Sequence, residues 1–198
     1  MAQYIIMLMA ALMLMTSCGP KGFIKGDYDE DVTSDNLLDD RWSESDMQKV
    51  VEDLVGKMHK HRVIKNAKVP PIVMVTRLQN KTSEHIDTQS IMDMVRVEVS
   101  NGGMVRFVDK AAREDVAEEY KYQGSGMVSG ETKKGAGGQI GADYIINGRL
   151  DSIVKDINKQ KTGYYKVTLN LTNLKTNIIE WTGYKQLRKK YKKRRMGL

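Results

Sequence analysis

Residues 144–187 read YIINGRLDSIVKDINKQKTGYYKVTLNLTNLKTNIIEWTGYKQL, and this stretch decides the predicted fold. It contains three runs rich in β-branched and aromatic side chains, at residues 144–154, 164–174 and 178–187. Lys175-Thr176-Asn177 is a short hairpin turn between the last two runs, and residues 156–163 link the first two. The stretch therefore predicts three consecutive β-strands.

Two amphipathic helices are predicted upstream of these strands. Ser43 and Asp46 form an S-x-x-D start, and apolar residues then recur at helical spacing, so residues 43–60 are predicted to be helical. Thr88 is the candidate N-cap of a second helix. That helix ends at Gly102-Gly103, because glycine readily takes the backbone conformation that closes a helix.

Shorter patterns complete the predicted fold. Asp109 is the candidate cap of a third helix over residues 110–122, and residues 71–78 and 104–108 read as strands. Residues 139–143 are predicted to add a helical turn. The order of helices and strands predicts an α/β, more closely α+β, class with a mixed sheet of about four to five strands flanked by helices.

The positive charge of the chain is concentrated near its end. The 198 residues carry a net charge of +7, and 40% of them are hydrophobic, enough for one core. Residues 185–195, KQLRKKYKKRR, contain eight basic residues and no acidic one, so the rest of the chain is nearly neutral. This distribution argues against a nucleic-acid-binding protein.

The sequence contains no convincing catalytic, metal or cofactor motif, so no enzyme activity and no cofactor are predicted. His59 and His61 are two residues apart on a helix, point to different faces, and are interpreted as solvated helix-end residues. Within the glycine-rich residues 124–138, Gly130 and Gly135 have phosphate-loop spacing, but the lysine that such loops require is missing. A surface loop is the better interpretation.

The only cysteine, Cys18, follows an uncharged apolar run at residues 4–15. This run is too short to span a bilayer comfortably and has the length of a signal-peptide core. A cysteine after such a run resembles the lipobox of bacterial lipoproteins, in which the signal is removed and the cysteine is acylated (palmitate among the acyl groups). We therefore expect Cys18 to be the lipidation site, and the protein to be held at the membrane by its acyl chains.

Four regions are predicted along the chain. They are a signal peptide at 1–17, a lipidated Cys18 with an acidic tether at 18–40, a globular domain at 41–187 and a basic tail at 188–198. The tether, with seven acidic residues in 19–40, reaches roughly 70 Å if fully extended. The basic tail has three interpretations: a solvated strand extension, a contact with anionic lipid or cell-wall polymer, or a nucleic-acid patch, ranked last.

From about Arg41 onward the sequence resembles the penicillin-binding-protein activator lipoprotein family, LpoB. The resemblance rests on Trp42, on PPIVMV followed by LQNKTSEHID, on NGGMVRFVD (101–109), on QIGADYIINGRL (139–150) and on LNLTNLKTNIIEW (169–181). The fold it implies is like that of the N-terminal domain of TolB. The family implies a lipid anchor in the outer membrane facing the periplasm, no catalytic site, and a class A penicillin-binding protein as partner. Such an activator regulates peptidoglycan synthesis, and with it cell wall biogenesis and cell shape.

The resemblance suggests three partner-binding residues: Asn80, Thr82 and Asn147. Ordinary turn chemistry is the alternative for Asn80 and Thr82, and a solvent-facing strand position is the alternative for Asn147. Trp42 and Trp181 are interpreted as core residues rather than contacts.

A second function remains open at this stage: a structural or assembly lipoprotein of an envelope or secretion complex. Such a protein would use the same domain to oligomerise, whereas an activator would be monomeric in solution. The tether also departs from the family pattern, because studied members have a long proline-rich linker and this one is short and acidic.

Overall fold

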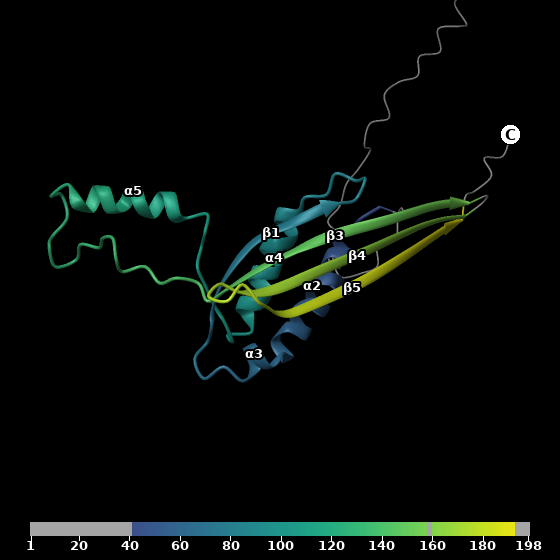
Figure 1. Cartoon of the computed structure of the whole chain (residues 1–198). Coiled ribbons are helices and arrows are strands. Elements are labelled where there is room, and N and C mark those ends of the chain that lie inside the picture. Colours follow the sequence, from purple (N-terminus) through teal and green to yellow (C-terminus); the bar gives the residue numbers. More distant parts are fainter. Residues whose placement is uncertain (1–40, 158–159, 193–198) are drawn as a thin grey trace, which may run out of the picture. The chain divides into compact units, whose positions relative to one another are not determined.

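The structure is a computed structural model that describes residues 41–157 and 160–192, and its centre is a five-stranded sheet (Figure 1). The strand order across the sheet is β2-β1-β3-β4-β5. The strands are β1 Ile72–Lys81, β2 Arg106–Phe107, β3 Tyr144–Ile157, β4 Gln160–Asn173 and β5 Ile179–Lys192. β1 pairs in parallel with β2 and β3, whereas β3, β4 and β5 are antiparallel. The predicted mixed sheet is therefore confirmed.

The three C-terminal strands form two long hairpins. β3 and β4 stay in register from the Tyr144–Asn173 pair to the Ile157–Gln160 pair. The predicted link over residues 156–163 is therefore wrong, because most of it belongs to the strands. Alternate residues of β4 are buried on one face of the sheet, as the twofold repeat of a strand requires.

Helices α2 (Glu44–Lys60) and α4 (Thr88–Asn101) cover that face of the sheet (Figure 1). Ser43 and Asp46 form the predicted capping box at the start of α2. The helix then buries one apolar stripe, and its members are Val50, Val51, Leu54, Val55 and Met58. This stripe packs on the buried side chains of the sheet, and together they form the core. A short helix, α3 (Arg62–Lys65), follows α2 and was not predicted.

The predicted cap of α4 is off by one residue. Asp87, not Thr88, is the N-cap, and its carboxylate accepts hydrogen bonds from the backbone N–H groups of Gln89 and Ser90 at 3.0 and 3.3 Å. A carboxylate reaches the free N–H groups of the first turn and also suits the positive end of the helix dipole. Gly103, with φ of 63°, confirms the predicted glycine termination.

The segment between β2 and β3 differs from its prediction. Asp109 caps a turn at Ala111 and Ala112, and helix α5 begins only at Arg113 and runs to Gly124. α5 has no buried residue. The predicted helical turn at residues 139–143 is absent from the described structure, because residues 139–142 have no regular secondary structure and the Asp143 N–H donates to the Ile72 carbonyl at 2.7 Å.

The lengths of β1 and β2 were also mispredicted. β2 contains only two of the predicted residues 104–108, whereas β1 continues past the predicted end at residue 78. Asn80 and Lys81 extend β1 by pairing with Leu150 and Asp151 of β3, although the sequence reads there as a loop. Pairing with a long neighbouring strand thus overrides the local turn signal of Asn80.

The predicted boundary between the domain and the basic tail lies inside a strand. Residues 188–192 continue β5, so this part of the tail is a strand extension, but it is not solvated throughout as the interpretation expected. Lys189 is buried, with 6% of its surface exposed, while its neighbour Lys190 is exposed. Residues 193–198, like Cys18 and the tether, lie outside the described residues.

Gly148 of β3 lies where the neighbouring β4 leaves no room for a side chain. A Cβ atom there would lie 2.2 Å from the Thr168 carbonyl oxygen and 2.8 Å from a methyl group of Leu169. We expect Gly148→Ala to lower the free energy of unfolding by about 1–3 kcal/mol, because backbone cannot move aside as a flexible side chain can. Urea denaturation of the full chain measures this change.

Gly56 supplies the matched control. It lies inside α2 and has open space where a Cβ would be placed, so Gly56→Ala should raise stability by about 0.5–1 kcal/mol. Equal effects of the two substitutions would contradict the proposed packing at Gly148.

Candidate partner-binding groove

A groove follows the outer edge of β1. β2 covers this edge only at Ile72 and Val73, and from Met74 to Lys81 the edge pairs with no other described strand. The groove has a volume of about 1150 Å³. Its walls come from β1, from α4, from the segment around residues 108–114 and from the start of β3. We refer to it as the β1-edge groove.

The unpaired edge of β1 determines what the β1-edge groove can bind. A strand edge presents backbone N–H and C=O groups in alternation, which an extended peptide can satisfy by adding a strand. β1 also contains one extra residue between Val75 and Leu78 relative to β3, and such a bulge twists an edge and redirects its side chains. The Thr76 hydroxyl donates to the Ile146 carbonyl at 3.0 Å and holds the bulge against β3.

Charged side chains of both signs line the rim of the β1-edge groove. On α4, Arg96 forms an ion pair with Asp93 at 3.3 Å, and the Gln89 amide donates to Asp93 at 3.2 Å. On the opposite wall, the Arg113 guanidinium lies 3.5 Å from the sulfur of Met74. The lining combines these charged side chains with apolar ones such as Val75 and Val108, a combination typical of protein-binding surfaces.

Of the predicted partner-binding residues, Asn147 is the one that lines this groove. Its side chain accepts a hydrogen bond from Asn170 at 3.4 Å, and Asn170 accepts one from the Thr182 hydroxyl at 3.0 Å. This polar row crosses β3, β4 and β5 on the face that α2 and α4 do not cover. Asn147 is thus held in place by its neighbours and half-buried.

Asn80 and Thr82 lie apart from the groove lining, at the end of β1. The side-chain oxygen Oδ1 of Asn80 accepts from the Thr82 backbone N–H at 2.9 Å and from the Thr82 hydroxyl at 2.8 Å. The Asn80 amide donates to the Glu84 carbonyl at 2.9 Å. The backbone of Asn80 belongs to β1, and its side chain makes local hydrogen bonds to the bend that follows and helps to position Glu84. Partner binding by Asn80 and Thr82 stays a prediction.

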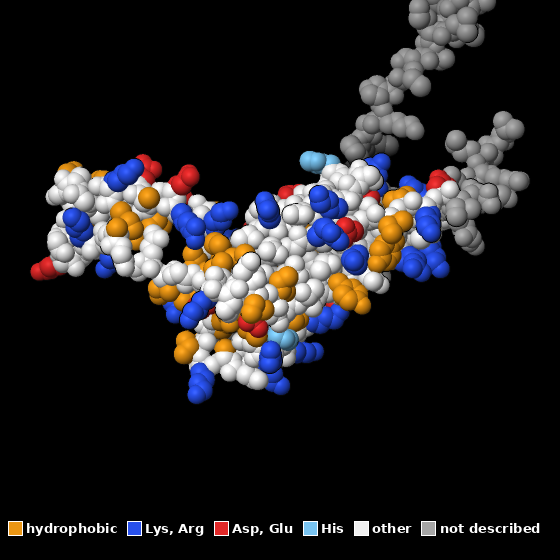
Figure 2. Space-filling view, in the orientation of Figure 1, with side chains coloured by type: hydrophobic (Ala, Val, Ile, Leu, Met, Phe, Trp, Pro, Cys, Tyr) orange, Lys and Arg blue, Asp and Glu red, His pale blue; other side chains and the backbone are white. Residues whose placement is uncertain are grey.

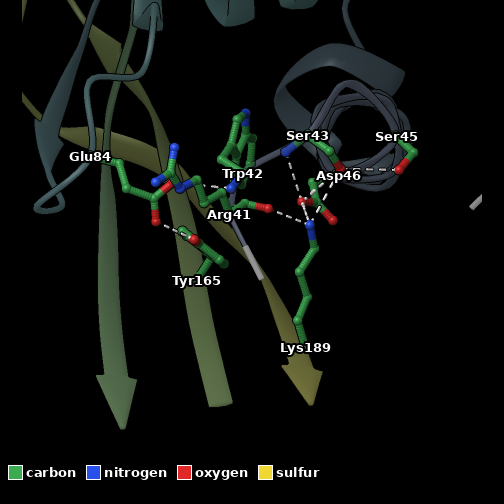
Figure 3. A network of polar contacts seen from close by, with 8 residues as sticks. All are labelled: Arg41, Trp42, Ser43, Ser45, Asp46, Glu84, Tyr165 and Lys189. Carbon is green, nitrogen blue, oxygen red and sulfur yellow. Dashed lines mark hydrogen bonds and ion pairs between the residues drawn. The ribbon is translucent and has the colours of Figure 1, made fainter. Parts of the chain in front are cut away.

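Glu84 joins the end of β1 to the start of α2 (Figure 3). One carboxylate oxygen accepts from the backbone N–H of Trp42 at 3.1 Å, and the other accepts from the Tyr165 hydroxyl. The rings of Trp42 and Tyr165 meet edge to face with centroids 5.6 Å apart. Trp42 and the buried Trp181 both pack with the core, as predicted.

Lys189 closes the same network from β5. Its ammonium lies 2.5 Å from the Asp46 carboxylate, and both side chains are more than nine-tenths buried. It also donates to the Arg41 carbonyl and to the Ser43 hydroxyl (Figure 3). Sequence reasoning missed this ion pair, although alternation along β5 after the inward Trp181 places Lys189 on the inner face.

A second acidic residue of α2 is also paired with β5. Asp53 lies 2.5 Å from the ammonium of Lys57 and 3.3 Å from that of Lys185. Burial raises the pKa of Asp53, but hydrogen bonds and charges of the two lysines outweigh it, so its pKa lies below 3.8. The stabilisation is present above the unfolded pKa and is lost as the pH falls through the folded pKa.

The described part of the chain offers no reaction centre that we can assign. Among residues 41–157 and 160–192, no three His, Cys, Asp or Glu side chains are grouped to hold a metal ion. His59 and His61 lie at the end of α2 and are half-buried, so they are only partly solvated, and Nε2 of His59 and Nδ1 of His61 are buried without a hydrogen-bond partner. His59 lies against Gly102 at the end of α4 and is thus a packing residue.

The fold and the groove define an α+β domain with an open, peptide-sized surface. The family model described as peptidoglycan-synthase activator LpoB matches residues 46–187, which is nearly all of the described domain. The chain therefore belongs to the LpoB family of peptidoglycan-synthase activators.

Solved structures that match part of the chain include members of that family. The LpoB C-terminal domain from Salmonella enterica is 16% identical, with 72% of this chain and 98% of that chain covered and a TM-score of 0.47. The domain from Escherichia coli gives the same identity and coverage with a TM-score of 0.46. The PelC dodecamer from Paraburkholderia phytofirmans is 14% identical, with 61% and 73% covered and a TM-score of 0.37. A comparison with curated protein sequences finds no match.

No helix in the described ranges has the length and apolar content needed to cross a bilayer.

The buried ion pair predicts a strong position effect within the basic end of β5. Lys189→Ala would leave the Asp46 carboxylate buried and unpaired, and we expect it to lower the free energy of unfolding by about 3–5 kcal/mol. Lys190→Ala, one residue away and exposed, should change it by less than about 0.5 kcal/mol. Denaturant titration of both variants measures the difference, and similar midpoints would show that Lys189 is dispensable.

Proposed function

We propose that this chain is an outer-membrane lipoprotein that binds a class A penicillin-binding protein and activates its peptidoglycan synthesis. The observation that carries the proposal is the family match over residues 46–187. The chain itself acts as a regulator and not as an enzyme. It must therefore change the synthase through binding energy alone.

Activation by binding has a definite physical requirement. A partner stimulates the synthase only if it makes more favourable contacts with the active state than with the inactive one. Coupling energies of this kind are about 1–3 kcal/mol, which corresponds to roughly 5- to 150-fold changes in affinity or population. A rigid docking surface is suited to this task, since little of the contact energy is then spent on ordering the activator.

The β1-edge groove is the surface that we assign to the synthase. Its open strand edge can receive an extended segment of the partner, and its paired charges on α4 can select the partner's side chains. Asn147 lies in its lining, in the position that the family resemblance suggested. We propose that the partner adds a strand to β1 and contacts Asn147 beside it.

The anchor belongs to the same proposal. Cys18 would carry the lipid, and residues 19–40 would connect it to the domain, whose first described residues are held by Lys189 and Glu84. Because the domain is held in place from Arg41 onward, the length of the chain before it would set how far the β1-edge groove can stand from the membrane.

Substitution of Asn147 tests the docking surface. Asn147→Arg adds a bulky cation to the β1-edge groove, and we expect at least a tenfold loss of affinity for the purified synthase and a parallel loss of stimulated glycan polymerisation. The matched control is Asn101→Arg, the same change at an exposed position at the end of α4. Binding is measured by surface plasmon resonance, and unchanged affinity of the Asn147 variant would exclude the groove.

Binding to a penicillin-binding protein is tested without assuming that the β1-edge groove is the binding site. The full chain, used as bait in detergent-solubilised membranes, should retain a protein that reacts with labelled penicillin, even at high salt. Loss of all such capture would remove the activator proposal. A large ring-shaped oligomer of the chain in solution would instead favour the assembly function.

The lipid anchor gives a separate prediction. Cys18→Ala should abolish incorporation of labelled palmitate and move the protein from the membrane fraction to the soluble fraction. Each buried methylene of an acyl chain contributes about 0.8 kcal/mol, so losing the chains removes stable membrane attachment. A variant that stays in the membrane fraction would show that another segment anchors the chain.

A further inference from the structure

One face of the sheet is left open by the helices. α2 and α4 pack on the face that carries the buried residues of β4, and the other face is formed by the alternate residues of β3, β4 and β5. Among these outward residues, from 145 to 155, 162 to 172 and 180 to 190, five are basic and two are acidic. The basic ones are Arg149, Lys155, Lys166, Arg188 and Lys190.

The strand register gathers all five basic residues into four consecutive cross-strand rows. These rows are Arg149–Thr168–Tyr184, Asp151–Lys166–Gln186, Ile153–Tyr164–Arg188 and Lys155–Thr162–Lys190. Rows lie about 7 Å apart along the strands, and neighbours within a row about 5 Å apart. We call this surface the basic rows, and Figure 2 shows Lys and Arg side chains exposed on the body of the molecule.

Most of these five basic residues form no ion pair within the described domain. On the inner face, Lys185 and Lys189 are paired with Asp53 and Asp46. In the basic rows Arg149 pairs with Asp151 at 3.0 Å, but the other four basic residues form no ion pair with any described residue. A set of unpaired like charges repels itself, so the surface is electrostatically disposed to bind an anion.

Two tyrosines lie among the cations. Tyr164 stands between Ile153 and Arg188 in its row, and Tyr184 is 57% exposed beside Thr168. Exposed aromatic rings on a sheet offer flat apolar faces for the rings of a linear polymer. Ile153 is the exposed aliphatic side chain of these rows, so little apolar surface is available to enter a lipid bilayer.

We propose that the basic rows bind a carboxylate-bearing glycan, the peptidoglycan of the cell wall. The cations would pair with the carboxylates of its peptide stems, and the tyrosine rings would pack on its sugars. The choice of this polyanion rests on the proposed function, which places the chain in the envelope where wall polymer is abundant. The basic rows border the row of Asn147, so wall and synthase would occupy adjacent surfaces of one sheet.

Cosedimentation of the full chain in detergent with purified peptidoglycan sacculi tests the proposal. We expect binding that weakens as salt is added, since exposed charges are screened. Sacculi whose carboxylates have been converted to amides should bind at least tenfold less. The double variant Lys166→Glu/Arg188→Glu should lose at least tenfold in affinity for untreated sacculi.

The matched control is Lys68→Glu/Lys175→Glu, which changes the net charge equally at exposed positions outside the sheet face. It should bind sacculi like the unmodified chain. If the two double variants bind alike, or if amidated sacculi bind as well as untreated ones, the proposal is wrong. Preference for phosphatidylglycerol vesicles over sacculi would also overturn it, in favour of a lipid-binding face.

Two further measurements keep the test decisive. Thermal unfolding verifies that the Lys166→Glu/Arg188→Glu variant is folded. If that variant is unfolded, the neutral double variant Arg188→Gln/Lys190→Gln is used in its place. Stimulation of the purified synthase, assayed on soluble lipid-linked substrate without sacculi, should be retained by the Lys166→Glu/Arg188→Glu variant. If this variant stimulates the synthase normally but no longer binds sacculi, the wall-binding site is separate from the proposed synthase site. If the unmodified chain binds sacculi but does not stimulate the synthase, the activator proposal is wrong and the wall-binding proposal is retained.

Discussion

The register of β3, β4 and β5 is the constraint on which the rest of the structure depends. Three strands of fourteen residues each pair along almost their whole length, with one irregularity between Leu171 and Thr172. A shift of one residue would exchange the two faces of a strand, so that the apolar stripe of α2 would meet lysines and threonines. The close approach at Gly148 helps to hold the register, because only glycine fits between Leu78 and the Thr168 carbonyl.

This register divides the charged residues of β5 into two groups with different surroundings. Lys185 and Lys189 point to the helical face and meet acidic residues of α2, whereas Arg188 and Lys190 point away from it. The contacts of Lys185 and Lys189 with Asp53 and Asp46 tie β5 to α2 across more than 130 residues of sequence. The cluster that reads as one basic tail is thus partly structural and partly a surface available for binding.

The extent to which the sequence predicted this molecule varies from element to element. α2, the glycine end of α4 and the three C-terminal strands were predicted, because apolar periodicity and glycine act locally. The ends of β1 and β2 and the start of α5 were not, since they depend on which strand pairs with which. Of the suggested site residues, Asn147 lines the β1-edge groove, whereas Asn80 at the end of β1 and Thr82 in the bend after it lie outside the groove lining, and their role stays a prediction. The groove itself has no sequence signal, because α4, β1 and residues 108–114 meet only after folding.

The sequence by itself determined the class of fold, through local composition and the order of its elements, and its motifs carried the resemblance to the family that the family model confirms. The lipid site at Cys18 stays a prediction from the sequence. Only the tertiary structure decided that Lys189 is buried against Asp46, that the edge of β1 is open and that five cations share four rows. Such features depend on contacts between distant segments, and the alternation of a strand shows two faces without showing which one the helices will cover.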